Sequence, residues 1–241
     1  MDTLGTRASG RWWEYYALRY FVGTVIGGIV ILYLATFPDS PFASLGIISV
    51  SDLKGLEIKQ LTALGALGFA YCYVASTPML LVHSLRGQLA LNPIRFDWRF
   101  WGITIPVLAI VHILAALRLK IDFLTYRWFG ALVLTGIVGI QFAMIIRAHL
   151  NRFARIKTFY LALARARGHG DSVAEYVESY RHLREHGNSV AIILLELALA
   201  LVLVSAQKPN ISVILLAAWL APSAYSWLIG SILEADTDWR E

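Results

Sequence analysis

Six apolar segments, each long enough to cross a membrane as a helix, constrain this chain more than any other feature. They run at about 18–37, 60–83, 100–117, 128–146, 189–206 and 211–233. A helix rises about 1.5 Å per residue, so about 20 apolar residues cross a hydrocarbon core of ~30 Å. Only 15% of the 241 residues are charged, whereas soluble domains carry about 25%. The sequence therefore predicts an all-α fold, a polytopic membrane helical bundle with six transmembrane helices.

The distribution of positive charge predicts the orientation of the bundle. If both termini lie on one side, most Lys and Arg residues fall in the N-terminus and in the segments at 84–99 and 147–188 on that same side. Cytoplasmic loops of membrane proteins carry this excess of Lys and Arg. We therefore expect a multi-pass protein of the bacterial inner membrane with its N- and C-termini in the cytoplasm. The same bias accounts for the net charge of +5.

The longest segment between two apolar stretches predicts a cytoplasmic helical hairpin between the fourth and fifth spans. Its first half, RAHLNRFARIKTFYLALARAR, is basic and is followed by a Gly-His-Gly turn. Ser172 and Glu175 then form a capping box that opens a second helix. We expect two antiparallel amphipathic helices that continue the neighbouring spans. The chain then divides into a four-span region (1–147), the hairpin (148–187) and a two-span region with a short tail (188–241).

The basic half of the hairpin predicts a binding surface. Its candidate residues are Arg152, Arg155, Lys157, Arg165 and Arg167. Attraction to the anionic lipid of the bilayer is the simplest interpretation, and docking of an acidic cytoplasmic protein is the alternative. The segment lacks the aromatic-interleaved basic pattern of nucleic-acid binding, which argues against that partner.

Three polar residues inside the predicted spans are candidates for function: Glu196, His112 and Gln141. An ionisable side chain at membrane depth is costly and usually faces the protein interior or a cavity. Glu196 and His112 differ in predicted depth by only about 6 Å, so they could share a layer. The leading interpretation is a protonated Glu196 that is hydrogen-bonded between helices as a structural element. A proton or ion pathway and a catalytic carboxylate are the alternatives.

A cluster at the predicted start of the fifth span comprises Arg181, Arg184, His186 and Asn188. The simplest interpretation is an interfacial cap at the level of the lipid headgroups. The R-x4-H spacing of Arg181 and His186 resembles the motif of HEPN ribonucleases, although that fold needs a soluble four-helix core. The R-x-H-G-N sequence resembles a stretch of the membrane glutathione-transferase family. That family has a glutamate soon after the asparagine, whereas here Ser189 follows Asn188. Either resemblance would imply an enzyme, and each covers fewer than ten residues.

The single cysteine, Cys72, excludes a disulfide within the chain and a metal site built on two thiolates. No P-loop, G-x-S-x-G, H-E-x-x-H or C-x-x-C motif occurs. We therefore expect no metal and no cofactor.

These features predict a non-enzymatic membrane protein. The leading hypothesis is a homo-oligomeric membrane subunit or gated pore that assembles through small-residue faces such as Gly23 and Gly27 and engages a cytoplasmic partner. Its architecture is like that of membrane components of bacterial stress and antiviral (phage) defence. The alternative is a proton-coupled secondary transporter that uses Glu196 and His112. A third hypothesis is a membrane enzyme that uses the 181–188 cluster.

Overall fold

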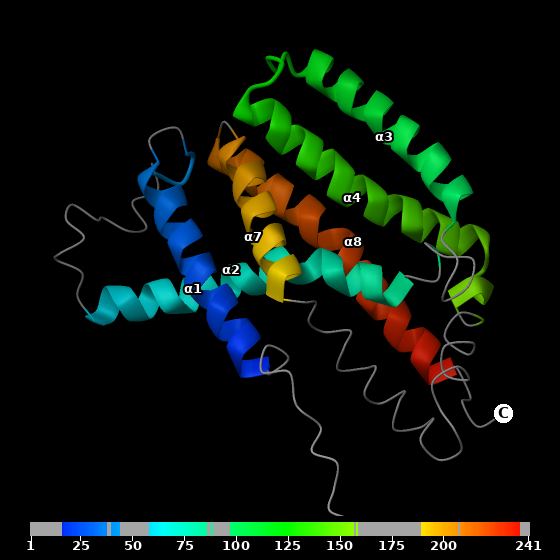
Figure 1. The fold of residues 1–241 in the computed structure, drawn as a ribbon, viewed down its shortest axis with the longest axis horizontal. Coiled ribbons are helices and arrows are strands. Elements are labelled where there is room, and N and C mark those ends of the chain that lie inside the picture. The colour runs from blue at the N-terminus through cyan, green and yellow to red at the C-terminus, as the bar shows by residue number, and fades with distance from the viewer. Residues whose placement is uncertain are drawn as a thin grey trace, which may run out of the picture.

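The chain forms a helical bundle without strands in the residues that the structure, a computed structural model, describes: 16–37, 40–43, 58–85, 88, 97–156, 158, 189–206 and 208–236. All six apolar segments predicted from the sequence are helical. The helices are α1 (Tyr16–Thr36), α2 (Ile58–Leu85), α3 (Trp98–Arg118), α4 (Tyr126–Leu150), α7 (Ser189–Val204) and α8 (Pro209–Asp236) (Figure 1).

Four of these helices are long and apolar enough to cross a membrane, namely α2, α3, α4 and α8. The apolar segments found in α1 and α7 are shorter, at Phe21–Thr36 and Val190–Val204. The predicted helical membrane protein is therefore supported, with four helices of spanning length in the described part of the chain. Most of the predicted hairpin, 157 and 159–187, lies outside the described residues.

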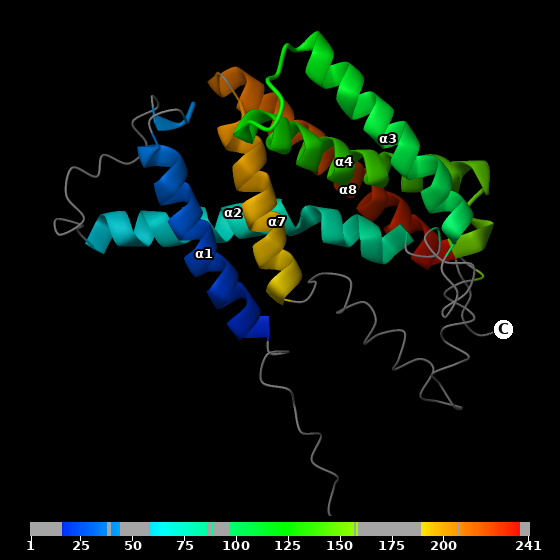
Figure 2. The ribbon, with the colours of Figure 1, turned by 45° about the horizontal axis from the view of Figure 1, so that its top comes forward.

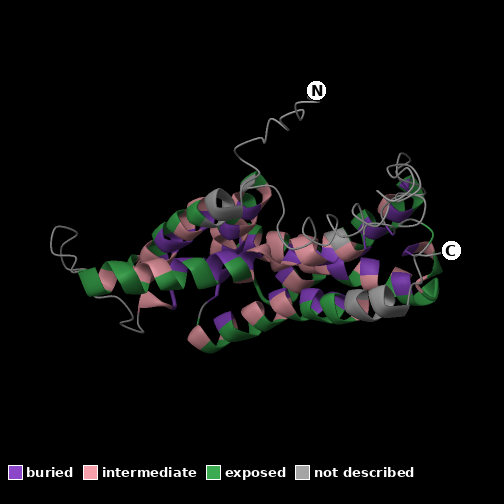
Figure 3. Ribbon diagram, turned by 90° about the horizontal axis from the view of Figure 1, so that it is seen from below, coloured by how far each residue is buried: buried purple, intermediate pink, exposed green. Residues whose placement is uncertain are grey.

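The helices form two groups that share α7 and α8. The first group also contains α1 and α2, and the second also contains α3 and α4. In one group, α1 and α7 run side by side across α2, as Figures 1 and 2 show. In the other, α4 lies between α3 and α8 and also contacts α7. Buried and exposed residues alternate along the helices (Figure 3). Helix α3 packs mainly against α4, so most of its surface points outward. That surface is apolar, with Ile103 and Leu117 about 70% exposed, as expected of a helix that faces lipid.

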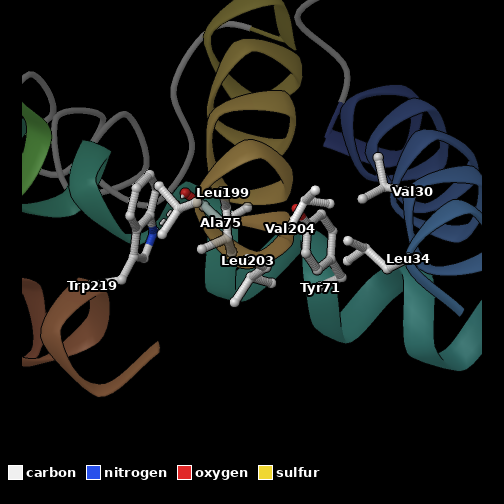
Figure 4. Packing of buried hydrophobic residues seen from close by; sticks show 9 residues of the cluster. Val30, Leu34, Tyr71, Ala75, Leu199, Leu203, Val204 and Trp219 are labelled. Carbon is white, nitrogen blue, oxygen red and sulfur yellow. Dashed lines mark hydrogen bonds between the residues drawn. The ribbon is translucent and has the colours of Figure 1, made fainter. Parts of the chain in front are cut away.

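The main core lies where α7 meets α1, α2 and α8 (Figure 4). Its buried residues are Val30 and Leu34 from α1, Tyr71 and Ala75 from α2, Leu199, Val202, Leu203 and Val204 from α7, and Trp219 from α8. The Trp219 indole N–H donates a hydrogen bond of 3.3 Å to the Ala75 carbonyl oxygen. This bond satisfies a polar group that would be costly to leave unpaired at this depth.

Helices α1 and α2 approach closely because glycines line their crossing. A Cβ atom on Gly27 would clash with the carbonyl group of Gly68, and one on Gly68 would lie 2.5 Å from the Gly28 nitrogen. A Cβ atom on Gly23 would clash with the Cys72 sulfur. These small residues therefore pack within one chain. The face carried by Gly23 and Gly27, which we expected to serve assembly, is already used by α2.

Helix α4 ends at Leu150 and does not continue straight into the hairpin, as the sequence had led us to expect. Arg152 and Phe153 have positive φ angles of 48° and 58°. The Phe153 amide donates to the Ala148 carbonyl and the Arg152 amide to the His149 carbonyl, both at 2.9 Å. This is the Schellman pattern that closes a helix. The chain then turns back, and Ile156 is buried against residues of α2, α3 and α4.

Candidate functional site

Glu196 lies on α7 and is completely buried, with 0% of its surface exposed. Gly23 of α1 borders the carboxyl group, because a Cβ atom there would lie 3.4 Å from its Oε1 atom. Cys72 of α2 adjoins the same group. The carboxyl group therefore sits where α1, α2 and α7 meet. The absence of a side chain at Gly23 lets Cys72 approach α1 beside the carboxyl group.

The interhelical hydrogen bond at Glu196 is made by its backbone. The Tyr71 hydroxyl of α2 donates to the Glu196 carbonyl oxygen at 2.6 Å, which ties α7 to α2. Neither carboxyl oxygen has a hydrogen-bond partner among the described residues. The Cys72 thiol, a weak donor, is within reach of the carboxyl group, but no hydrogen bond of ordinary geometry joins them. The side-chain hydrogen bond expected of a structural glutamate is not formed within the described residues.

His112 lies at a different interface, between α3 and α4. Its ring is buried and packs edge-on against Trp128, with the ring centroids 4.9 Å apart. Neither ring nitrogen has a partner in the part of the chain that the structure describes. Glu196 and His112 belong to different helix pairs, and the structure does not bring them together.

Gln141 lies at a third interface, between α4 and α8. The Ser223 hydroxyl donates a hydrogen bond of 2.7 Å to the Gln141 Oε1 atom, and both residues are buried. The Gln141 amide nitrogen has no partner among the described residues. The three intramembrane candidates therefore occupy three separate helix contacts and do not share one polar interior.

A polar cluster built around the buried residues Asp97 and Gln88, which we call the Asp97 cluster, joins the ends of α2, α3 and α4. It consists of Asp97, Arg147, Arg155, Gln88 and Asn151. The Asp97 Oδ2 atom accepts hydrogen bonds from Arg147 and from Arg155, the latter at 2.9 Å. Arg147 also donates to the Gln88 carbonyl oxygen at 2.9 Å, and the Asn151 amide donates to the Gln88 side chain at 3.3 Å.

Asp97 has two roles in this cluster. Its carboxylate caps α3 by accepting a hydrogen bond from the Phe100 amide, and it forms ion pairs with the two arginines. Burial alone would raise the pKa of Asp97, but the hydrogen bonds from Arg147, Arg155 and Phe100 outweigh that effect and lower it to about 2. Asp97 is therefore ionised at neutral pH although only 3% of its surface is exposed.

With this geometry established, the chain can be compared with known proteins. No protein-family model, curated protein or solved structure matches it. The proposals about function below therefore depend on the residues of this chain alone.

The structure places two of the basic residues predicted to bind lipid or a partner. Arg155 is turned inward to Asp97, with 22% of its side chain exposed, whereas Arg152 is exposed at the turn after α4. The remaining candidates lie outside the described residues; they are Lys157, Arg165, Arg167, Arg181, Arg184, His186 and Asn188. Among the described residues, no three His, Cys, Asp or Glu side chains gather in a way that could hold a metal ion.

The Asp97 cluster was not predicted from the sequence. The signal in the sequence is a single acidic residue at the start of an apolar helix, since Asp is favoured as an N-cap. Its pairing with Arg147 and Arg155 joins residues 50 and 58 positions apart, which no local pattern reveals.

Proposed function

We propose that this protein is a six-span subunit of an oligomeric, gated pore in the bacterial inner membrane, with both termini in the cytoplasm. In this proposal the cytoplasmic hairpin engages a protein partner. The Asp97 cluster then transmits the movement of the hairpin to the membrane helices.

The observation that carries this proposal is the double ion pair at Asp97. Arg147 belongs to the last turn of α4, Asp97 begins α3, and Arg155 lies at the start of the predicted hairpin. A pull on the hairpin would therefore act directly on Asp97 and on the end of α3. Breaking a buried ion pair leaves an unpaired charge, so the cluster favours two discrete arrangements over gradual bending.

Helix α3 is suited to be the part that moves. It packs mainly against α4, while the other helices contact several neighbours. Its contacts with α4 include Leu108 against Gly139 and the ring of His112 against Trp128. Release of Asp97 would leave packing contacts such as these to hold α3 in place.

A conducting path in this proposal would run between copies of the chain. Glu196, His112 and Gln141 are each buried in contacts between helices of the same chain. They therefore do not form the lining of a wide channel within the monomer. The apolar outer surface of α3 and the exposed Ala217 and Ala221 of α8 remain available for contact with a second copy.

Reconstitution in liposomes tests the proposal. We expect the wild-type protein to be oligomeric by light scattering in detergent and to pass little ion current without its partner. Asp97→Asn should increase ion flux because the arginines lose their charged partner. Arg99→Gln is the matched control, since Arg99 is exposed in the same helical turn and forms no ion pair with Asp97. A monomeric protein, with no flux in the wild type or in Asp97→Asn, would overturn the proposal.

Proton-coupled transport through paired Glu196 and His112 is the weaker proposal. Glu196 adjoins Gly23 and Cys72, and His112 adjoins Trp128. A proton route between them would need a connecting chain of polar groups, and the described contacts do not supply one.

A further inference from the structure

The carboxyl group of Glu196 is buried, and no described side chain near it carries a positive charge that could neutralise it. The titratable groups that interact with it, Cys72 and Tyr71, both come from α2, and neither carries positive charge. Helix α1 faces it with Gly23, and α7 itself contributes the neighbouring apolar residue Ile192. No side chain that the structure describes on α1, α4 or α8 forms an ion pair with it.

An ionised carboxylate in this position would lose its hydration and gain no positively charged partner among the described residues in return. Such a charge is either paired or removed by protonation in proteins. The packed arrangement of α1, α2 and α7 therefore fits the neutral carboxylic acid. The ionised form would need water, and water could reach it only if this helix crossing opened.

We propose that Glu196 is a proton-binding site that binds its proton while α1, α2 and α7 are packed together and releases it when the crossing opens. On opening, the carboxylic acid O–H bond breaks, the electron pair stays on the carboxylate, and the proton passes to an entering water molecule. The inference does not depend on the gated-pore proposal, because it concerns the protonation of one side chain.

The contacts indicate which helix moves. Tyr71 donates its hydroxyl hydrogen to the Glu196 carbonyl oxygen, so α7 and α2 are joined by a hydrogen bond next to the site. Gly23 of α1 borders the carboxyl group, and no described residue of α1 forms a hydrogen bond with it. Separation of α1 from α7, with the close α1–α2 contact at Gly27 and Gly68 and the Tyr71 bond both kept, would expose the carboxyl group.

Infrared spectroscopy of the protein in lipid vesicles tests the protonation. We expect the wild type to show a protonated-carboxyl stretching band at neutral pH that is absent from Glu196→Gln and disappears reversibly as pH rises. The shift of this band in heavy water shows that it arises from a carboxylic acid, and Glu196→Gln assigns it to Glu196. Absence of the band at neutral pH would overturn the proposal. So would a band that persists until the protein unfolds, since Glu196 would then be a permanent structural acid.

The lone thiol of Cys72 reports the opening without added cysteines. We expect the rate of Cys72 alkylation to increase with pH in both proteins, and the increase to be about tenfold larger in the wild type than in Glu196→Gln. A tenfold difference corresponds to ~1.4 kcal/mol in the free energy of opening. Thiol ionisation also accelerates alkylation in both proteins. The negative charge of an ionised Glu196 beside Cys72 disfavours the thiolate in the wild type, so this effect opposes the expected difference and cannot produce it. Identical pH profiles for the two proteins would show that Glu196 does not control this crossing.

Discussion

Gly27 of α1 and Gly68 of α2 face each other so closely that a Cβ atom on Gly27 would lie 3.1 Å from the Gly68 carbonyl carbon and closer still to its oxygen. The obstacle is backbone, which cannot rotate away as a flexible side chain would. This contact sets the distance between α1 and α2. It therefore also sets the size of the space that holds the Glu196 carboxyl group beside Gly23.

We predict that Gly27→Ala destabilises the protein by about 1–3 kcal/mol, the usual cost of overpacking a close contact. Gly65→Ala is the matched control, because a Cβ atom at Gly65 would meet nothing within 4 Å. Alanine is the better helix former, so the control should be neutral or up to about 1 kcal/mol more stable. Unfolding in lipid–detergent mixtures measures both values. Equal stabilities of the two variants would show that the close approach of α1 and α2 does not exist.

Much of the helical architecture could be predicted from the sequence, but the neighbours of each helix could not. Apolar length alone located all six helices within a few residues. A membrane helix is apolar on most faces, so it lacks the amphipathic stripe that shows which side packs in a soluble protein. The end of α4 was missed for a related reason. Its closing position is Arg152, where helices usually place glycine, so the sequence carries no stop signal there.

The candidate site was predictable only in part. The burial of Glu196 follows from a lone charge within an apolar run, since such a group is costly in contact with lipid. Its neighbours Gly23 and Cys72 come from helices distant in the sequence. The Asp97 cluster depends entirely on such long-range contacts.

We predict that acid weakens the fold through Asp97. Its pKa is about 2 in the folded protein against an ordinary 3.8, so the folded state binds this proton more weakly than the unfolded state does. The ion pairs therefore contribute fully above about pH 4, and their contribution, about 2 kcal/mol, is lost as pH falls from about 4 to about 2. Unfolding measured across this range gives the pH dependence.

Asp97→Asn separates this charge effect from helix capping, because asparagine is an equally good N-cap. The variant should be about 2 kcal/mol less stable than the wild type at neutral pH and should lose less stability on acidification. An acid profile of Asp97→Asn that matches the wild type would mean that other carboxyl groups control the acid response.

We predict that Lys120→Gly stabilises the protein. Lys120 has a positive φ of 51° at the end of α3, where its amide donates to the Leu117 carbonyl oxygen at 3.3 Å. A non-glycine residue in this conformation costs about 1 kcal/mol, which glycine would relieve in part. Arg118→Gly, two residues earlier within the helix, should instead cost about 1 kcal/mol. Thermal unfolding of the two variants should therefore shift in opposite directions, and parallel shifts would contradict the backbone geometry.

We predict that Ser223→Ala loosens α4 from α8. The Ser223 hydroxyl is the donor to the Gln141 Oε1 atom, and its loss leaves that buried amide with neither of its ends paired among the described residues. Interhelical hydrogen bonds in membranes contribute about 0.6 kcal/mol on average and up to about 1.7. Because Gln141 is fully buried, we expect a loss of about 1 kcal/mol.

Ser226→Ala is the control for this interhelical bond. Ser226 is equally buried on α8, but its hydroxyl donates within the same helix, to the Pro222 carbonyl oxygen at 2.9 Å. Removal of the Ser226 hydroxyl affects only the Pro222 carbonyl of the same helix and leaves no unpaired group on α4. The change in unfolding free energy should therefore stay below about 0.5 kcal/mol. The double variant Ser223→Ala with Gln141→Leu should recover part of the loss, because removal of both partners leaves no buried polar group unpaired. If Ser223→Ala and Ser226→Ala cost the same, the hydrogen bond to Gln141 would not hold the two helices together.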